Sequence, residues 1–354
     1  MKRIIIAVLL LALIASLAGC SNFGNSSTDD DSRKSYETSI SAAYPVEYHD
    51  QKAIMMFEEK FQCSVNLEEF DSNEDIYEAL IKSKDGEWDV VVVSDYMVDR
   101  CIQENRLAKL DHSKIPSMSG IASQYLGPAY DPDNSYHVPY MVGTVGILYN
   151  TKNCGISSWA ELFDLEGFLM MDSERDGVGI ALKTLGYSMN SVDTDELREA
   201  QEVLRSAKRN IGGFYETADI VEYITAYQAD AGVVYSGDGK LARNLSEETF
   251  AFVIPEEGSN RWVDAFVIPK DSAHVDLAHE FIEFMCQSHV AKRNMDTTGY
   301  TSPIQEAWSE YAGDLVMFTP SEDLARCEAF THSPEIVEKH HEIWSSVRGS
   351  WKEG

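Results

Sequence analysis

The sequence predicts an α/β protein with two domains, and three observations carry that prediction. From about residue 38, short apolar segments alternate with segments in which apolar residues recur every three or four positions, as strands alternate with helices. The segment WDVVVVSDYMVD at 88–99 holds four consecutive valines between polar flanks, which is typical of a buried parallel strand. About 320 residues lie beyond residue 37, more than one hydrophobic core comfortably supports, so two domains are expected.

The expected elements alternate regularly up to about residue 105. They are strands at 38–45 and 63–70, helices at about 50–62 and 75–84, and the valine-rich strand. That strand ends at Ser94-Asp95-Tyr96, and Ser94 is the expected N-cap of the next helix. Ligands of open α/β sheets bind beyond the carboxyl ends of strands. These three residues are therefore candidate binding residues.

The second half of the chain repeats this alternation. A long β-rich run at 137–150 is suited to carry the chain from one domain into the other. The other expected elements are a capped helix start at 157–163, strand, loop and helix at 167–182, helices at about 194–208 and 218–228, strand, turn and helix at 231–242, a pair of strands at 249–255 and 262–269 across the turn EEGSN, helices at about 274–288 and 289–297, a turn at 299–303, and a helix at about 333–347.

The N-terminus predicts export. Lys2 and Arg3 precede an apolar run from Ile4 to Ala18, which is typical of a secretory signal peptide at 1–19. The run closes at Leu-Ala-Gly-Cys, which resembles the lipobox of bacterial lipoproteins, in which the cysteine, here Cys20, is acylated. An ordinary signal peptide with an incidental Cys20 is the alternative. Residues 20–37 are polar and aperiodic, so we expect a lipidated flexible tether that holds the protein outside the cytoplasm, at the periplasmic or outer face of the cell membrane.

Charge and cysteine usage exclude several classes. The formal net charge is −30, and it becomes −32 once Lys2 and Arg3 are removed with the signal peptide. A nucleic-acid partner is not expected, because binding phosphates requires clustered Lys and Arg. Five cysteines remain after Cys20, with no CxxC spacing, which argues against a metal knuckle or a disulfide framework. One pair could form among Cys63, Cys101, Cys154, Cys286 and Cys327, and the sequence does not choose it.

Signatures of catalysis and of cofactor binding are absent from the sequence. GVGIAL at 177–182 lacks the third glycine of a dinucleotide fingerprint, and SGDGKLA at 236–242 lacks the spacing of a phosphate-binding loop. Neither a GxSxG nor an HExxH sequence occurs. His340 and His341 are adjacent on an expected helix and do not share a face. We therefore expect no catalytic residues, no cofactor and no metal.

Trp262 and Asp264 form the pair that best indicates a ligand. Residues two apart in a strand face the same side, so this ring and this carboxylate are expected together. An organic ammonium binds to such a pair, through the ring's quadrupole and a charged hydrogen bond. The alternative is an ordinary strand edge with a half-buried Trp and a solvated Asp.

Several segments together resemble one known family. DVVVVSDYMVDR, YDPDNSYHVPYMVGTVGILYN, SWAELF, NRWVDAFVIP and TTGYTSP occur in this order between about Tyr44 and Pro303. In order and spacing they resemble bacterial spermidine/putrescine-binding proteins, the extracytoplasmic subunits of polyamine ABC importers. The resemblance implies a two-lobed periplasmic-binding-protein fold, type II-like, with the ligand in the interlobe cleft. We expect 38–143 plus 264–308 to form the N-terminal lobe, and 144–263 plus 309–354 the C-terminal lobe.

The resemblance also implies a set of ligand-binding residues. Asp264 would bind one ammonium, the rings of Trp262, Tyr96, Tyr235 and Tyr300 would pack on the carbon chain, and Asp176 or Asp95 would take a distal amine. The complete set is Tyr48, Ser94, Asp95, Tyr96, Ser173, Asp176, Tyr235, Trp262, Asp264 and Tyr300.

The chain departs from the family at four places. Ala43-Tyr44-Pro45 stands where the family has Tyr-Asn-Trp, so one ring is missing. Ser173 and Asp176 replace an Asp and a Glu, Tyr235 replaces a Trp, and the family's C-terminal polar residue has no clear match. These departures leave the identity of the amine open.

The resulting functional prediction is capture of a polyamine, a putrescine-like or spermidine-like cation, for the transmembrane subunits of an ABC permease. The protein is expected to act as a lipid-anchored monomer and not as an enzyme. Two alternatives remain: a binding protein for another small solute, such as a metal ion or a zwitterion, and a membrane-tethered enzyme or sensor domain.

Overall fold

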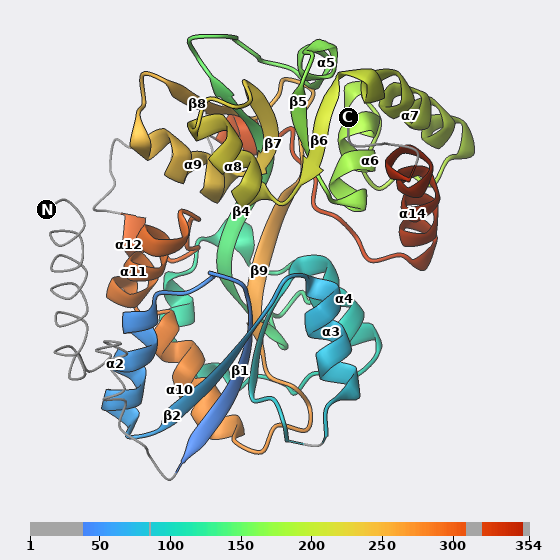
Figure 1. Cartoon of the computed structure of the whole chain (residues 1–354). Helices are drawn as coiled ribbons and strands as arrows, with labels where there is room; N and C mark the ends of the chain where they lie inside the picture. The colour runs from blue at the N-terminus through green and yellow to red at the C-terminus, as the bar shows by residue number, and fades with distance from the viewer. Residues whose placement is uncertain (1–37, 85, 309–320, 350–354) are drawn as a thin grey trace, which may run out of the picture. The chain divides into compact units, whose positions relative to one another are not determined.

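The computed structural model describes residues 38–84, 86–308 and 321–349 (Figure 1). The expected signal peptide at 1–19, Cys20 and the tether at 20–37 lie outside these described residues. So do residues 309–320 and 350–354 of the expected C-terminal lobe.

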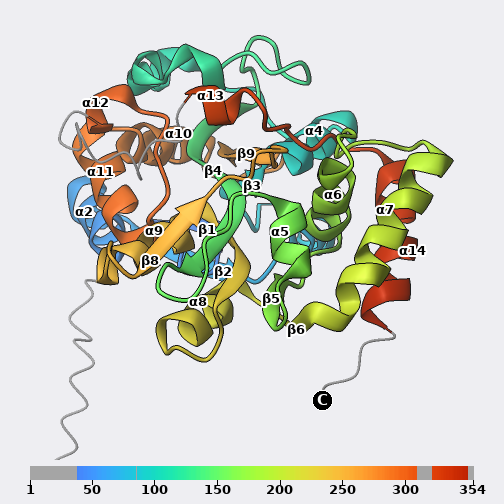
Figure 2. The ribbon, with the colours of Figure 1, turned by 90° about the horizontal axis from the view of Figure 1, so that it is seen from above.

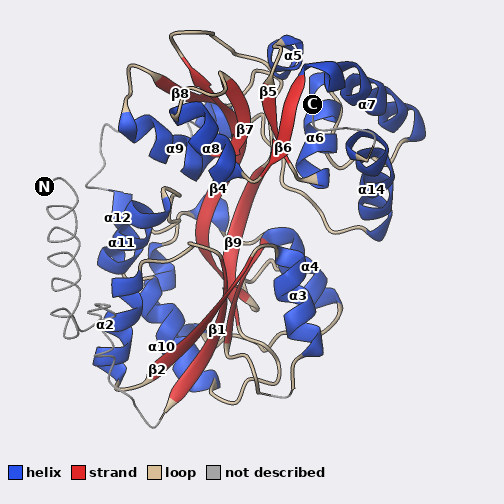
Figure 3. Cartoon of the chain, viewed as in Figure 1, coloured by secondary structure: helices blue, strands red, loops and turns tan. Residues whose placement is uncertain are grey.

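One mixed sheet runs through the described residues. Its strands are β1 (Ser39–Pro45), β2 (Ser64–Phe70), β3 (Val90–Ser94), β4 (His137–Asn150), β5 (Phe168–Met171), β6 (Ile211–Tyr215), β7 (Ala231–Tyr235), β8 (Phe250–Val253) and β9 (Arg261–Val267). The strand order is β2-β1-β3-β9-β4-β7-β5-β6, and β8 also pairs with β4. Figure 3 shows these strands passing through the centre of the molecule with helices on both sides.

Helices connect the strands and cover the sheet. They are α2 (Gln51–Phe61), α3 (Asn73–Lys82), α4 (Asp95–Gln103), α5 (Trp159–Asp164), α6 (Glu174–Thr184), α7 (Thr194–Ala207), α8 (Thr217–Thr225), α9 (Ser236–Leu245), α10 (Val275–Met285), α11 (Ser288–Thr298), α12 (Gln305–Trp308), α13 (Ser321–Leu324) and α14 (Pro334–Arg348). Several begin at a side-chain cap, as when Asp50 accepts a hydrogen bond from the Ala53 amide at 2.9 Å. Seen from above, α6, α7 and α14 gather on one side of the sheet (Figure 2).

The hydrophobic core divides along the length of β4. Met141, in its first half, belongs to a cluster with Phe57 and Phe281, whereas Val145, in its second half, belongs to another with Trp159. A third cluster lies under α3 and α4, on the β1–β3–β9 part of the sheet. The protein is thus a mixed α/β chain with two lobes, as the sequence predicted, and β4 passes from one lobe into the other.

The pairing of β4 with its neighbouring strands shows where the chain passes from one lobe into the other. From His137 to Thr144 the strand pairs antiparallel with β9, and from Val145 onward it pairs with β7 and β8. β9 in turn pairs with β3, with Ser94 opposite Asp264. Because β9 lies between β3 and β4, its side chains are held where the two lobes meet.

The predicted pairing of 249–255 with 262–269 is wrong. β8 and β9 both run antiparallel to β4, so they run in the same direction along it. The segment between them, which includes EEGSN, carries the chain onward without reversing it. Ser94 is also only partly as expected: it occupies the N-cap position of α4 but makes no capping hydrogen bond.

The cysteines are unpaired among the described residues. Cys63, Cys101, Cys154, Cys286 and Cys327 are all free thiols, so the structure contains none of the disulfides that the sequence left open.

Gly143 on β4 gives a test of how tightly the strand pair is packed. A Cβ atom at this position would lie 2.3 Å from Cζ2 of Trp262. We expect Gly143→Ala to lower the free energy of unfolding by about 1–3 kcal/mol, because the indole ring must shift within a packed environment. Urea unfolding followed by circular dichroism measures the change. Gly155→Ala is the matched control, since nothing lies within 4 Å of a Cβ there. Equal unfolding midpoints for the two variants would contradict the prediction.

Candidate ligand-binding site

Four aromatic side chains meet where the lobes join. Tyr300 contacts Tyr48 with ring centroids 5.4 Å apart and Trp262 at 5.1 Å, and Trp262 contacts Tyr235 at 6.2 Å. All three contacts are edge-to-face, an arrangement that aromatic pairs favour. We refer to Tyr48, Tyr235, Trp262 and Tyr300 as the aromatic box.

The backbone explains why these rings converge. Tyr235 ends β7 immediately before α9, and Tyr48 lies between β1 and α2, so both stand beyond the carboxyl ends of strands. Tyr300 follows Gly299, whose φ of 76° ends α11 in the left-handed conformation that glycine adopts without strain. The next residue, Thr301, accepts a hydrogen bond from the Val142 amide at 2.8 Å, which fixes the turn to β4.

Asp264 is the carboxylate on the same face of β9 as Trp262. The Ser94 hydroxyl donates to Asp264 Oδ1 at 2.5 Å. Asp264 is 8% exposed, and no positive charge among its described neighbours offsets that burial. Burial raises the pKa of Asp264 to about 6, although the hydrogen bond from Ser94 opposes the shift.

Asp176 is a second buried carboxylate, at the N-terminus of α6. Its Oδ1 accepts from Asn260 Nδ2 at 2.7 Å. Its Oδ2 accepts from the hydroxyls of Ser173 at 2.7 Å and Tyr235 at 3.5 Å. Burial raises the pKa of Asp176 above its ordinary value. This carboxylate therefore stands behind the Tyr235 ring of the box.

Asp238 is a third carboxylate, which the sequence interpretation did not single out. It lies in the first turn of α9, and its Oδ2 accepts from Thr217 Oγ1 at 2.8 Å and from the Tyr300 hydroxyl at 3.4 Å. Burial raises its pKa as well. The sequence held a signal for it, because Asp238 comes shortly after the end of β7 just as Asp95 and Tyr96 come directly after the end of β3.

Two polar atoms of the box are buried without a hydrogen-bond partner in the part of the chain that the structure describes. One is Trp262 Nε1, a donor. The other is the Tyr48 hydroxyl, whose pKa is raised by burial and also by the nearby Asp264 carboxylate. Buried polar atoms are rarely left unpaired. These two therefore mark the interior of the box as a place for a polar ligand.

Asp95 and Tyr96 make their hydrogen bonds outside the aromatic box. The Asp95 carboxylate accepts from the Tyr96 amide at 2.8 Å and from the Val263 amide at 3.3 Å, so it extends the pairing of β3 with β9. Burial raises its pKa to about 7. The Tyr96 hydroxyl donates to Glu74 Oε1 at 3.2 Å, and the Arg175 guanidinium covers its ring, with Cζ 3.4 Å from the centroid.

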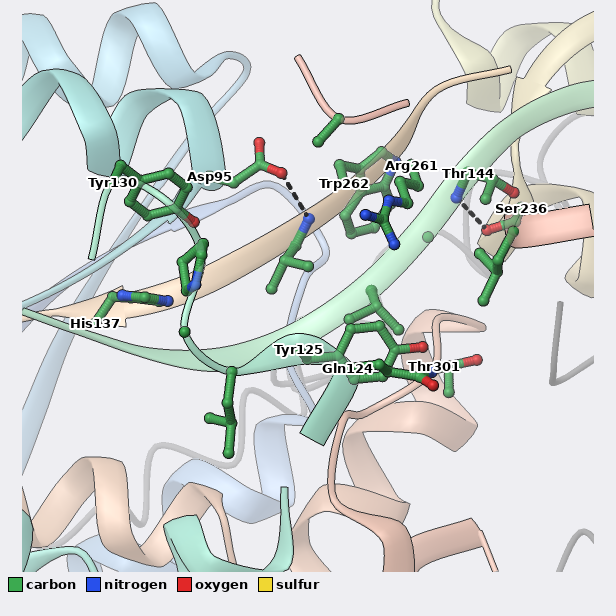
Figure 4. A pocket seen from close by; sticks show the side chains of 18 of the residues that line it. Asp95, Gln124, Tyr125, Tyr130, His137, Thr144, Ser236, Arg261, Trp262 and Thr301 are labelled. Carbon is green, nitrogen blue, oxygen red and sulfur yellow. Dashed lines mark hydrogen bonds between the residues drawn. The ribbon is translucent and has the colours of Figure 1, made fainter. Parts of the chain in front are cut away.

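A cavity of about 460 Å³ adjoins the box at Trp262 (Figure 4). Its lining includes Asp95, Tyr130, Arg261 and Val263. Arg261 and Val263 alternate along β9 with Trp262 and Asp264, so they belong to the other face of the strand. Trp262 therefore belongs both to the aromatic box and to the lining of this cavity.

Two searches of the described ranges bear on other kinds of site. No group of three or more His, Cys, Asp or Glu side chains in them is arranged to hold a metal ion. None of their helices has both the length and the apolar character needed to cross a membrane.

Comparisons with known proteins give the class. Residues 52–313 match the family described as bacterial extracellular solute-binding protein. The spermidine/putrescine-binding periplasmic protein of Salmonella typhimurium is 30% identical over 292 residues, which cover 80% of this chain and 83% of that protein. The putrescine/agmatine-binding protein of Pseudomonas aeruginosa is 26% identical over 320 residues, covering 82% and 87% of the two chains.

Solved structures agree with the sequence relatives. PotD of Streptococcus pneumoniae, a spermidine/putrescine ABC transporter substrate-binding protein solved with calcium and HEPES, superposes with a TM-score of 0.78 at 28% identity, over 88% of this chain and 99% of its own. The TpPotD lipoprotein of Treponema pallidum gives 0.79 at 26% identity, over 87% and 99%.

Fold and comparisons together define an extracellular, two-lobed solute-binding protein. This chain belongs to the bacterial extracellular solute-binding protein family, which is named for binding a solute and not for a reaction. The resemblance to spermidine/putrescine-binding proteins predicted from the sequence is confirmed.

The buried carboxyl of Asp264 predicts how the stability of the unliganded protein depends on pH. Its pKa is about 6 in the fold, against 3.8 without the protein environment. Between these values the folded state holds a proton that the unfolded state has lost, so stability falls as pH rises, and the full cost is present above about pH 6. We expect Asp264→Asn to raise the free energy of unfolding at pH 7.5 by about 1–3 kcal/mol, at about 1.4 kcal/mol per pKa unit.

Urea unfolding between pH 4 and pH 8 measures this effect, and the gain should shrink toward zero near pH 4. Asp133→Asn changes an exposed carboxylate and is the control. A gain of the same size at both ends of this range would show that ionisation of Asp264 is not its cause.

Proposed function

We propose that this protein captures a polyamine outside the cytoplasm and presents it to an ABC importer. One observation carries the proposal: two buried carboxylates, Asp264 and Asp176, and the half-buried Asp238 border one aromatic box, and two of the three accept a hydrogen bond from a ring hydroxyl. Asp176 accepts from Tyr235 and Asp238 from Tyr300, while Asp264 lies beside Tyr48. Acidic groups this deeply buried are costly unless a partner neutralises them. An organic cation with several amines is a partner of that kind.

The chemistry of the box fits a polyamine in detail. An ammonium at Asp264 would make a charge-assisted hydrogen bond in a site where water does not compete. The rings of Trp262 and Tyr300 would lie against its methylene groups and attract its positive charge. Asp176 or Asp238 would then receive the second amine. Ser173 contributes to this end by orienting Asp176 through its hydroxyl.

The names of the relatives support the same ligand class. Three of the four proteins compared above are named for spermidine, putrescine or agmatine, which all carry amine or guanidine groups on a short carbon chain. We infer from this agreement that the solute here is also an aliphatic polycation.

We infer that the two lobes move apart to admit a ligand, and we propose which residues belong to each lobe. Because the four rings contact one another, a ligand can enter only when they separate. We propose that residues 38–143 plus 264–308 move as one lobe and 144–263 plus 309–354 as the other, hinging where β4 changes partners. The closed form would engage the transmembrane subunits of the permease, with a monomer anchored through Cys20 after removal of residues 1–19.

Replacing Asp264 should weaken polyamine binding. We expect Asp264→Asn to reduce affinity by about 10–100-fold, the equivalent of one charge-assisted hydrogen bond of about 1.5–3 kcal/mol. Calorimetric titration of the full chain with putrescine, spermidine and spermine measures the loss. Asp133→Asn should bind as the unmodified chain does. Unchanged affinity in Asp264→Asn would refute the assignment of this residue.

Affinity should also depend on pH. With a pKa of about 6 in the empty site, Asp264 is mostly protonated at pH 5 and must ionise to hold an ammonium. We expect affinity to fall about tenfold between pH 7 and pH 5, because a carboxyl one pH unit below its pKa is only about one-tenth ionised. Titrations in matched-ionic-strength buffers test this, with Asp264→Asn expected to show a smaller pH dependence. An affinity independent of pH over this range would contradict the role of Asp264.

A further inference from the structure

The cavity of about 460 Å³ in Figure 4 takes part of its lining from one face of β4 and β9. Val142 and Thr144 of β4 line it. These two residues pair with Val263 and Arg261 of β9, which line it as well. Side chains directly opposite each other on neighbouring strands share one face of the sheet, and alternation along β9 puts Asp264 on the other face. This part of the lining is therefore turned away from the Asp264 carboxylate.

Arg261 brings a positive charge to this cavity. Its backbone is fixed, since the Arg261 amide donates to the Glu328 carbonyl at 2.8 Å. Its guanidinium forms no ion pair and no side-chain hydrogen bond within the described part of the chain, and Figure 4 shows it turned toward the other lining side chains. Burial raises the pKa of Tyr125, another lining residue, and the Arg261 charge opposes that shift. A guanidinium of this kind is suited to bind a carboxylate through two parallel hydrogen bonds.

Thr144 adds a hydroxyl that has no partner among the described residues. The residue is completely buried, and its Oγ1 makes no hydrogen bond there. Its amide is satisfied, because it donates to Ser236 Oγ at 3.2 Å. Buried polar atoms are rarely left unpaired. Since Thr144 shares a face with Arg261, its hydroxyl is placed to meet the same polar occupant as the guanidinium.

The rest of the lining suits an apolar body. Tyr125, Tyr130 and Trp262 contribute aromatic side chains, and cavities of about 300–1,000 Å³ with a few polar groups are typical of sites for small organic molecules. Asp95 lines the cavity too. Burial raises the pKa of Asp95 to about 7, so near that pH this carboxyl is about half protonated and repels an anion less than an ordinary aspartate would.

We propose that this cavity is a second binding site, which takes a small organic carboxylate with an aromatic or other apolar body. The carboxylate binds the Arg261 guanidinium and accepts a hydrogen bond from the Thr144 hydroxyl, and the apolar body packs on the tyrosine rings. The two sites differ in the charge they select. Carboxylates border the aromatic box, which favours a cation, whereas the guanidinium in the cavity favours an anion. This site does not depend on the polyamine function.

The test compares a carboxylate with its neutral amide. Full-length protein in a nonionic detergent is titrated calorimetrically with 3-phenylpropionate and with 3-phenylpropionamide at pH 7.5. We expect the carboxylate to bind at least about tenfold more tightly, because only it forms charge-assisted hydrogen bonds. Arg261→Met should remove this preference, and Arg261→Lys should keep most of it. Arg198→Met, on the exposed face of α7, is the matched control and should bind both probes as the unmodified chain does.

Thr144→Val gives a second, smaller effect at the same place. It removes the hydroxyl with little change of shape and should lower affinity for the carboxylate by about two- to tenfold, the equivalent of one hydrogen bond.

Three outcomes would overturn the proposal. They are equal affinity of the unmodified chain for the two probes, a preference that survives in Arg261→Met, and a preference lost equally in Arg198→Met, which would indicate general surface charge. If Arg261→Met lacks the thermal transition of the unmodified chain, Arg261→Gln replaces it. Each of these outcomes is distinct from a failure to bind putrescine, which bears on the aromatic box alone.

Discussion

The site depends on the position of one strand, β9, between β3 and β4. That position sets Ser94 opposite Asp264 and Gly143 opposite Trp262, so the ring and the carboxylate are held by backbone hydrogen bonds on both sides. Strand alternation then puts both side chains on one face. The rings of Tyr48, Tyr235 and Tyr300 come from strand and turn ends and pack onto this fixed pair. A central, doubly paired strand is a stiffer support for such a pair than a loop would be.

Burial makes the carboxylates of the empty candidate site energetically unfavourable. Asp264, Asp176 and Asp238 all have pKa values raised by desolvation, so the empty, closed form carries unfavourable charge. In the proposed function, a cation that enters would remove this penalty, and the groups that destabilise the empty state would favour the bound one. This coupling provides a physical reason for lobes that close over a ligand: closure without a cation leaves the carboxylates unpaired, whereas closure with one neutralises them.

The sequence predicted most of the fold because each element is locally encoded. The run at 137–150 coincides with β4, and the capping serine before α5 lies where the pattern placed it. Which strands pair with each other was harder to predict from the sequence. The segments of β8 and β9 were predicted to form a hairpin because turn-forming residues lie between two apolar runs. Such residues have the same composition whether the chain reverses direction there or continues onward.

The candidate site shows the same division between local and long-range information. Trp262 and Asp264 were identified by spacing within one strand. The residues that the sequence interpretation missed are recognised only from contacts between distant segments of the chain. Asp238 contacts Tyr300, Arg175 contacts the ring of Tyr96, and Arg175 also pairs with Glu74. Neither contact leaves a periodicity or a spacing in the sequence.

The two ends of the site are built differently, and this difference matters for recognition. At one end, Asp264 and Ser94 belong to adjacent strands of one sheet, so that end exists whether the lobes are open or closed. At the other, Arg175 belongs to α6 while Tyr96 and Glu74 belong to α4 and α3, so this contact joins α6 to two helices on the other side of the hinge strands. A ligand would therefore be held first by the permanent end, where any primary ammonium can bind. In such an arrangement the hinge strands would hold the first ammonium, and side chains from the helices on either side of them would complete the site.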